Sequence, residues 1–399
     1  MHAALQQYWV VTFSYWAFTL TDGALRMLVI LYFHQLGYSP LEVAGLFLLY
    51  EFCGVITNLV GGWFAAHVGV NSTLHIGMAL QMIALAMLLV DAEQLSVIYV
   101  MFAQAVSGIA KDLNKMSAKS SIKLLLPKDE QGKLFKWVAL LTGSKNTLKG
   151  VGFFMGALLL STVGFRGAIA AMIAGLALVL GISYLLLQQD LGKAAYKPKF
   201  TELFSKSSAV NYLSAARFFL FGSRDIWFVI ALPVFLQDQL HWESTQVGTL
   251  LALWVIGYGF VQSAAPIITR VRHNADPDGH TAILWALLLA MMPIAMVLLL
   301  LQDNEGVEWI LIIGLIGFGF VFAINSAVHS YLIIAYAQED GVSLDVGFYY
   351  MANALGRLVG TLLSGWVYQV SGLVACLVLS SVFILAAAFL SLLLPKQCV

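Results

Sequence analysis

Long apolar stretches, separated by short polar segments, run through the whole sequence. Each is long enough to cross the apolar core of a membrane, which is about 30 Å thick. Hydrophobic residues make up 60% of the 399 residues and charged residues only 11%, whereas a soluble globular protein carries roughly 25% charged residues. A globule of this size would lack the polar surface that water requires. The pattern therefore predicts an all-α protein that crosses a membrane many times.

Twelve such stretches can be placed, six before and six after a polar segment. The predicted spans are 8–33, 41–66, 73–91, 95–118, 134–163, 167–188, 208–236, 244–269, 281–302, 308–336, 345–369 and 372–394. The predicted domains are an N-terminal six-helix bundle at 1–188, a cytoplasmic linker at 189–207 and a C-terminal six-helix bundle at 208–399. The first span has no basic segment before it and no clear small-residue cleavage site. We therefore expect it to be retained and not removed as a signal peptide.

The orientation is predicted from the lysines and arginines that lie outside the spans or at their ends, without Lys119 at the margin of the fourth span. Such residues favour the cytoplasmic side. An even number of helices places both termini on one side. That side holds eleven of these residues and the other only Arg166, so we expect cytoplasmic termini and a place in the inner (plasma) membrane. The eleven are Lys123, Lys128, Lys133, Lys136, Lys193, Lys197, Lys199, Lys206, Arg270, Arg272 and Lys396.

The two halves of the sequence carry similar residues at equivalent positions. A shift of 203 positions aligns Asp22 with Asp225, Gly45 with Gly248, Gly54 with Gly257, and His67 with Arg270. Parallel repeats of six helices are the architecture of major facilitator transporters. The sequence resembles that superfamily, which implies twelve transmembrane helices in two pseudo-symmetric six-helix bundles.

The superfamily's signature between helices 2 and 3 is degenerate in this chain. Gly62 and Gly69 fit the signature and His67 supplies a basic residue, but Ala66 stands where an aspartate is usual. Gln104 lies near the place of the helix 4 arginine of drug antiporters. The proton-coupled multidrug subgroup therefore fits poorly.

Twelve charged side chains lie inside the predicted spans and more than two residues from a span end, where a charge is costly and usually faces a cavity. The eight basic residues exceed the four acidic residues by four, and a water-filled cavity with that surplus attracts anions. The basic residues are Arg26, Lys111, Lys115, Lys145, Lys149, Arg217, Arg224 and Arg357, and the acidic residues are Asp22, Glu51, Asp112 and Asp225.

The fourth and fifth spans carry the most informative lysines. Lys111, Lys115 and Lys119 are four residues apart and form a stripe on one helical face, and Lys145 and Lys149 repeat this spacing beside Asn146. Clustered like charges repel one another unless an anion joins them. We predict that the substrate-binding residues are Lys111, Lys115, Lys145, Lys149, Arg26, Arg224, Arg357 and Asn146.

A structural charge network is the alternative interpretation. Asp112 would then pair with Lys115, and Asp225 would neutralise the surroundings of Arg224. Asp22 and Glu51 have two open interpretations: they carry a proton that is coupled to transport, or they are fixed partners of Arg26, one turn from Asp22. Tyr15, Trp16, Phe18, Tyr349 and Tyr350 can line a cavity, although packing is the commoner role of such residues.

Several other functions lack their motifs. The sequence has no phosphate-binding loop for ATP, no nucleophile elbow and no histidine cluster with metal spacing. Its net charge of zero argues against nucleic acid as a partner, and Cys53, Cys376 and Cys398 form no CxxC pair. We therefore expect no cofactor. An intramembrane enzyme remains the rival class, but no nucleophile or histidine–acid pair converges at one depth.

Three stretches resemble the organoarsenical efflux permeases (ArsJ type). They read YWAFTLTDGALRM at 15–27, GIAKDLNKMSAKSS at 108–121 and FKWVALLTGSKNTLKGVG at 135–152. The resemblance implies export of 1-arseno-3-phosphoglycerate, which a glyceraldehyde-3-phosphate dehydrogenase makes from arsenate, and hence arsenate resistance. The expected partners are this anion, the dehydrogenase and membrane lipids. A phosphate-ester or organic anion exchanger of the same fold is the alternative.

Overall fold

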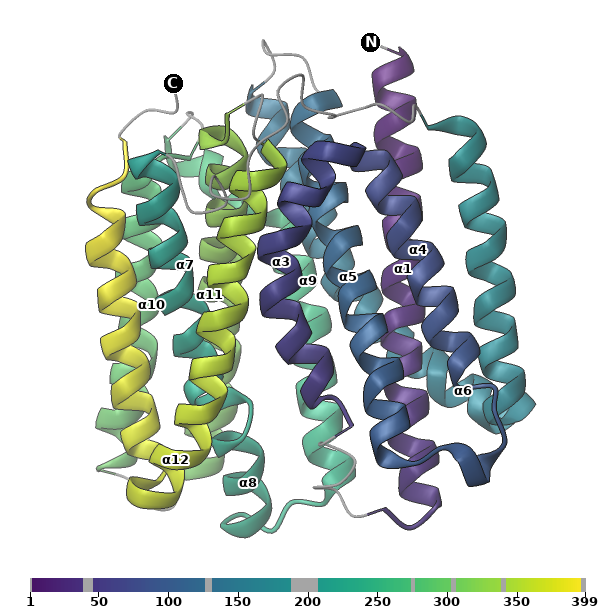
Figure 1. Cartoon of the computed structure of the whole chain (residues 1–399). Coiled ribbons are helices and arrows are strands. Elements are labelled where there is room, and N and C mark those ends of the chain that lie inside the picture. The colour runs from purple at the N-terminus through teal and green to yellow at the C-terminus, as the bar shows by residue number, and fades with distance from the viewer. Residues whose placement is uncertain are drawn as a thin grey trace. The chain divides into compact units, whose positions relative to one another are not determined.

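The computed structural model describes residues 2–38, 46–125, 131–187, 207–273, 277–302, 306–338 and 342–395. Within these ranges the chain forms helices joined by short turns, and no strand is present (Figure 1). The linker residues 189–206, Lys128, Lys396 and Cys398 lie outside them, as do the start of the second predicted span and four of the basic residues used for the orientation, Lys193, Lys197, Lys199 and Lys206.

The helices follow the predicted order. They are α1 (His2–Gln35), α3 (Leu48–Val68), α4 (Val70–Met87), the short 3-10 helix η1 (Ala92–Gln94), α5 (Val97–Leu125), α6 (Gln131–Leu186), α7 (Ser208–Phe228), α8 (Ala231–Asp238), α9 (Ser244–His273), α10 (Gly279–Leu300), α11 (Val307–Tyr336) and α12 (Val342–Ser391).

Two of the helices, α6 and α12, are each two spans joined at a glycine. Gly164 has φ 71° and Gly372 has φ 75°, and the backbone at both is not helical. A side chain would be strained in this left-handed region, whereas glycine adopts it freely. These breaks lie where the sequence predicts the turns between spans, at 163–167 and 369–372.

The predicted single span at 208–236 is interrupted. Helix α7 ends at Phe228 and α8 begins at Ala231. Pro233 explains the break, because proline has no N–H to donate to the carbonyl four residues earlier and its ring clashes with that carbonyl. The two helices still form one apolar segment, Ser208–Asp238, that is long enough to cross a membrane.

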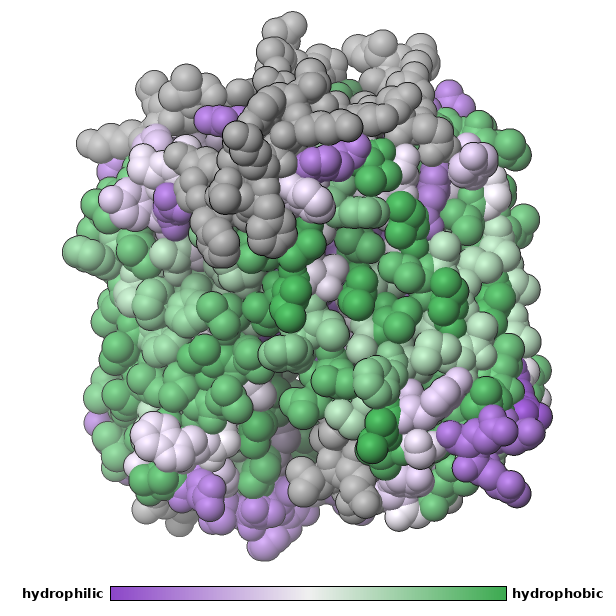
Figure 2. Space-filling model, in the orientation of Figure 1, coloured by the Kyte–Doolittle hydropathy of each residue, from purple (hydrophilic) through white to green (hydrophobic). Residues whose placement is uncertain are grey.

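Nine helical segments of the described chain are long and apolar enough to span a membrane. Two of them, in α6 and α12, contain a glycine break and count as two spans each. One further helix, α5, brings the number of spans to twelve. It carries more charged residues than the nine segments, and it continues to Leu125, seven residues beyond its predicted end at 118. Figure 2 shows hydrophobic residues over the middle of the helices and hydrophilic residues toward their ends.

The helices form two compact units. Unit 1 comprises Met1–Glu130, Ser144–Phe204 and Ala337–Met351. Its core packs α1, α3 and α4 around α5, and its buried apolar side chains run from Phe18 to Leu176. The start of α12, although late in the sequence, belongs to this unit.

Unit 2 comprises Gln131–Gly143, Ser205–Tyr336 and Ala352–Val399. In its core α11 packs against α7, α9 and α10. Stacked and edge-on rings of Trp227, Phe318 and Phe322 fill the centre. Each unit therefore includes a short segment from the other half of the chain. The predicted domain boundaries at 188 and 208 stay a prediction.

Candidate functional site

The lysine stripe of α5 surrounds a buried carboxylate in unit 1. Lys115 Nζ donates to Asp112 Oδ1 at 2.6 Å, and Lys111 Nζ lies 3.8 Å from Asp112 Oδ2. Only 2% of the Asp112 side chain is exposed. Gly54 of α3 makes room for it, since a Cβ at that position would lie 2.8 Å from Asp112 Oδ2. The ion pair expected between Asp112 and Lys115 is present.

Tyr50 of α3 links this stripe to α1. Lys111 Nζ lies 3.8 Å from the centroid of the Tyr50 ring, and the Tyr50 hydroxyl donates to Asp22 Oδ1 at 2.7 Å. Arg26 pairs with Glu51 at 3.3 Å, and its guanidinium lies 5.4 Å from the centroid of the same ring. In the part of the chain that the structure describes, the ion pair of Arg26 is therefore with Glu51, and Asp22 is held by Tyr50.

Tyr350, at the start of α12, faces the other two lysines of the stripe. Lys115 Nζ lies 4.7 Å and Lys119 Nζ 5.2 Å from the centroid of its ring. The segment reaches α3 through a close contact of two glycines, because a Cβ on Gly347 would lie 3.0 Å from the Gly62 Cα. This contact brings a residue from the last third of the sequence to the lysines of α5.

Lys145 and Lys149 of α6 complete the cluster. Both are half-buried, and neither forms an ion pair with a carboxylate of the described residues. The charge of Lys145 is repelled by the three lysines of α5 and by Lys149. Lys149 is repelled by Arg26 and attracted by Asp22. A hydrogen bond from Trp16 Nε1 to Ser144 Oγ, 2.8 Å long, ties α6 to α1 next to Lys145. Asn146, also half-buried, follows directly.

Unit 1 thus gathers most of the predicted binding residues, with more positive than negative charge. Six cationic groups stand against three carboxylates. This lysine cluster consists of Arg26, Lys111, Lys115, Lys119, Lys145 and Lys149, with Asp22, Glu51 and Asp112. Such a surplus, held away from bulk water, suits a ligand with several negative charges.

Unit 2 holds a smaller arginine cluster around Asp225, whose side chain is fully buried. Arg224 binds Asp225 Oδ1 at 2.5 Å, and Arg357 Nε binds Asp225 Oδ2 at 3.1 Å. The Arg224 guanidinium also lies 5.1 Å from the centroid of the Phe221 ring. Asp225 therefore holds two of the three arginines that the sequence predicts as ligands, and the expected neutralisation of Arg224 by Asp225 is present.

Arg217 is buried in a network of neutral side chains that the sequence does not predict. Its Nε donates to Asn353 Oδ1 at 2.9 Å, and its Nη1 donates to Ser326 Oγ at 3.2 Å. Gln262 donates to the same Ser326 oxygen at 3.2 Å. Neutral polar residues give no charge signal in an apolar sequence, so only their spacing on buried helix faces hints at this network.

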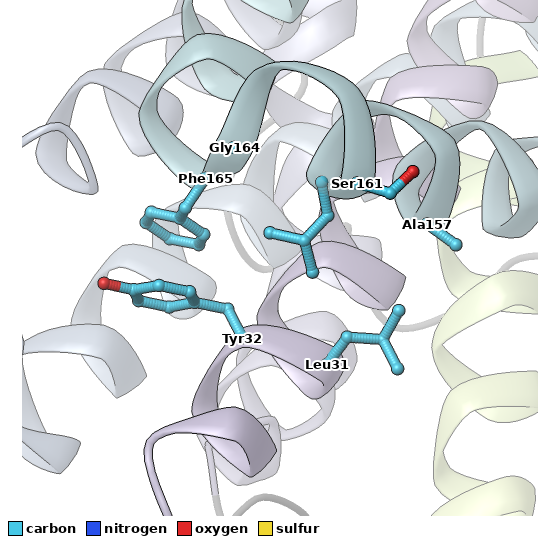
Figure 3. A pocket seen from close by; sticks show the side chains of 7 residues that line it. Leu31, Tyr32, Ala157, Ser161, Gly164 and Phe165 are labelled. Atoms are coloured by element: carbon cyan, nitrogen blue, oxygen red, sulfur yellow. The ribbon is translucent and has the colours of Figure 1, made fainter.

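A cavity of about 420 Å³ in unit 1 contains none of the predicted site residues. It lies beside the Gly164 break, where the Tyr32 ring stacks on Phe165 with centroids 4.0 Å apart (Figure 3). Leu31, Ala157 and Leu160 line the rest, together with Ser161. The Ser161 hydroxyl donates to the Leu158 carbonyl. Because no charged side chain lines this cavity, it does not suit an anion.

The sequence matches the model of the Major Facilitator Superfamily over residues 11–331 and again over 213–397. No curated protein matches it.

Three solved structures share the fold at low sequence identity. The human organic anion transporter MFSD10 (TETRAN) is 16% identical with a TM-score of 0.75, and the match covers 97% of this chain and 99% of that chain. A bacterial homologue of the iron transporter ferroportin, in the outward-facing state, is 13% identical with a TM-score of 0.77 over 97% and 98%. The proton:xylose symporter XylE, bound to 6-bromo-6-deoxy-D-glucose, is 15% identical with a TM-score of 0.75 over 99% and 96%. The predicted fold is confirmed.

Proposed function

Since the chain belongs to the Major Facilitator Superfamily and shares its fold with solved transporters, we propose that this multi-pass membrane transporter exports an anionic organoarsenical. The substrate is 1-arseno-3-phosphoglycerate, a three-carbon acid that carries a phosphate and an arsenate. Its removal from the cytoplasm confers resistance to arsenate.

The charge of the lysine cluster is the observation that carries this proposal. Six cations stand against three carboxylates, and Lys145 and Lys149 have no carboxylate partner among the described residues. A phosphate and an arsenate ester bring several negative charges to this surplus. Lysine ammonium groups on flexible stems suit two oxyanions at variable spacing, because each acts as a mobile point charge.

The chemistry of the cysteines supports pentavalent arsenic over trivalent arsenic. Trivalent arsenic is a soft ion that thiolates bind well. Cys53 lies on α3 in unit 1 and Cys376 on α12 in unit 2, and neither belongs to the lysine cluster. The cations of that cluster instead match the oxygens of an arsenate ester. The resemblance of 15–27, 108–121 and 135–152 to the organoarsenical permeases points to the same substrate.

A phosphate-ester or organic anion exchanger is the second candidate. The similarity to a human organic anion transporter favours it, and no cation of the cluster distinguishes arsenic from phosphorus. The two candidates differ in what they do for a cell that is exposed to arsenate.

Growth of an arsenic-sensitive host tests the substrate. The host carries the transporter, a glyceraldehyde-3-phosphate dehydrogenase, or both, and grows on arsenate or arsenite. We expect protection against arsenate only with the pair, because free arsenate lacks the glycerate part. The triple Cys53→Ser, Cys376→Ser and Cys398→Ser variant should protect equally well. Equal protection by the transporter alone, or protection against arsenite, would show that the substrate is a different one.

We also propose that the protein lies in the inner (plasma) membrane with both termini in the cytoplasm. A reporter that is active only outside the cytoplasm should stay silent when it is fused after Val399 and become active when fused after Arg166. Arg166 is exposed and pairs with Asp91 at 2.7 Å, at the end of unit 1 that would face outward. The reverse pattern of reporter activity would invert the topology.

A further inference from the structure

Two tyrosine rings in unit 1 face four of the six cations of the lysine cluster. Tyr50 lies under Lys111 and Arg26, whose charged groups are 3.8 and 5.4 Å from the ring centroid. Tyr350 lies under Lys115 and Lys119, at 4.7 and 5.2 Å. A cation over an aromatic face is attracted by the electrons of the ring. Lys111 and Lys115 share the single carboxylate of Asp112, and Arg26 pairs with Glu51. The rings therefore add an attraction for these cations without adding negative charge to the cluster.

Both rings are fixed in place. Tyr50 is 3% exposed, and its hydroxyl donates to Asp22 Oδ1 at 2.7 Å. Tyr350 is 4% exposed and packs edge-on against Tyr349, with ring centroids 5.0 Å apart. A ring that cannot turn away holds the ammonium group of a long, flexible lysine in one region of the site.

We propose that Tyr50 and Tyr350 are positioning residues for anion binding, a step that rests on the proposed function. A lysine ammonium has three donors, so it can rest on a ring and still donate to an oxyanion. The ring leaves the positive charge in place and restricts the side chain before the ligand arrives. Restricting a flexible group in its bound conformation lowers the entropy lost on binding.

A third tyrosine supports a ligand at this place. Tyr15 of α1 is 2% exposed, and its hydroxyl has no hydrogen-bond partner among the described residues. It interacts electrostatically with Tyr350, Asp112 and Asp22 and therefore lies near the same cluster. A buried hydroxyl without a partner is unfavourable, and a bound oxyanion would accept its hydrogen bond.

The test compares leucine and phenylalanine at each ring. The dissociation constant for 3-phosphoglycerate, a stable phosphorylated three-carbon acid, is measured on purified full-length protein, together with the melting temperature. We expect Tyr50→Leu and Tyr350→Leu to weaken binding roughly 3- to 30-fold, the range of a cation–π contact. Tyr50→Phe and Tyr350→Phe keep the ring and should stay within about 2-fold of wild type. Tyr50→Phe should still lower the melting temperature, because Asp22 loses its donor.

Tyr32 provides the matched control, since it is a ring of unit 1 that stacks on Phe165 beside an apolar cavity. Tyr32→Leu should leave the dissociation constant unchanged. If both leucine variants at 50 and 350 bind as tightly as wild type, or if phenylalanine fails to restore binding, the rings do not position the cations. If wild-type protein does not bind 3-phosphoglycerate, the anion site itself is wrong, which separates the failure of the proposed function from that of this inference.

Discussion

In unit 1 Asp112 lies between Lys111 and Lys115, and in unit 2 Asp225 lies between Arg224 and Arg357. Both carboxylates are buried, and each oxygen faces one cation. The surroundings differ. Near Asp112 there are further cations on α1, α5 and α6. In unit 2, Arg224 packs against the rings of Phe221 and Phe322, and Arg217 packs against Phe221 and bonds to neutral side chains.

This difference indicates which of the two clusters has positive charge available to bind an anionic ligand. Arg224 and Arg357 contact the carboxylate at 2.5 and 3.1 Å, and the planar fork of arginine suits such fixed pairs. In unit 1 the Lys111 contact is loose, at 3.8 Å, and Lys145 and Lys149 have no carboxylate partner among the described residues. We infer that the lysine cluster is the principal anion site and that the arginine cluster contributes less.

The largest effect should follow from removing single lysines of unit 1. Lys111→Ala, Lys145→Ala and Lys149→Ala should each lower export more than about 100-fold with normal membrane insertion, because an acidic ester is costly to bury without a cation. Lysine-to-arginine changes at these sites should not restore the full rate, since the head groups differ in geometry. Arsenic remaining in cells that grow on arsenate is the measurement.

Lys123 is the control for these variants. It lies on the same helix, beyond the stripe, and donates to the Ala337 carbonyl. Lys123→Ala should export at nearly the wild-type rate. Wild-type export by Lys111→Ala and Lys145→Ala would favour the alternative in which the lysines form only a structural network.

The second effect concerns stability in unit 2. Asp225→Asn should leave Arg224 and Arg357 buried without a counter-charge, and breaking a buried pair in this way costs about 3–5 kcal/mol. The melting temperature of the purified protein and the amount in the membrane should both fall. A melting temperature equal to that of wild type would mean that water or other groups solvate these arginines, and that they are as available to a ligand as the lysines.

A smaller effect is expected for the arginines as ligands. Arg224→Ala and Arg357→Ala remove one charge-assisted contact and should lower export about tenfold. Asp225 keeps one arginine partner in each variant, so the stability loss should be less than in Asp225→Asn. A loss of export as large as that of Lys145→Ala would make the two clusters equal partners in binding.

The smallest effect should appear in the pH dependence of export. Asp22 accepts a hydrogen bond from Tyr50, and Glu51 pairs with Arg26. Both carboxyl groups belong to the lysine cluster and would respond to its ligand. Asp22→Asn or Glu51→Gln should change the pH profile of flux if a proton is coupled through them. Coupling is not required, since an inside-negative potential favours anion export by about 2.3 kcal/mol per charge per 100 mV. An unchanged pH profile in both variants would exclude proton coupling through these two residues and favour uniport.

The sequence predicts the helices well because span length and glycine turns are local signals. The breaks at Gly164 and Gly372 lie at the short segments that separate one predicted apolar span from the next. The break before α8 is missed, although Pro233 marks it, because the apolar run continues across it.

The candidate site is predicted in its charges and in the ion pairs within one helix, but not in the partners that come from another helix. The lysine stripe follows from spacing on one helix, and the Asp112–Lys115 pair lies within one turn. The pairing of Arg26 with Glu51 depends on how α1 packs against α3, which spacing along one helix does not determine. Tyr50 and Tyr350 carry no charge signal, and in an apolar sequence they look like packing residues.

Arsenic uptake by inside-out membrane vesicles tests the central claim most directly. The medium contains glyceraldehyde-3-phosphate dehydrogenase with its substrates and arsenate, so that the ester forms at the cytoplasmic face, and arsenic inside the vesicles is measured with and without a pH gradient. Wild-type vesicles should accumulate arsenic only while the dehydrogenase works. Vesicles with Lys145→Ala and Lys149→Ala together should accumulate none, and those with Lys123→Ala should match wild type. Wild-type accumulation by the double lysine variant would contradict the assignment of the lysine cluster as the anion site.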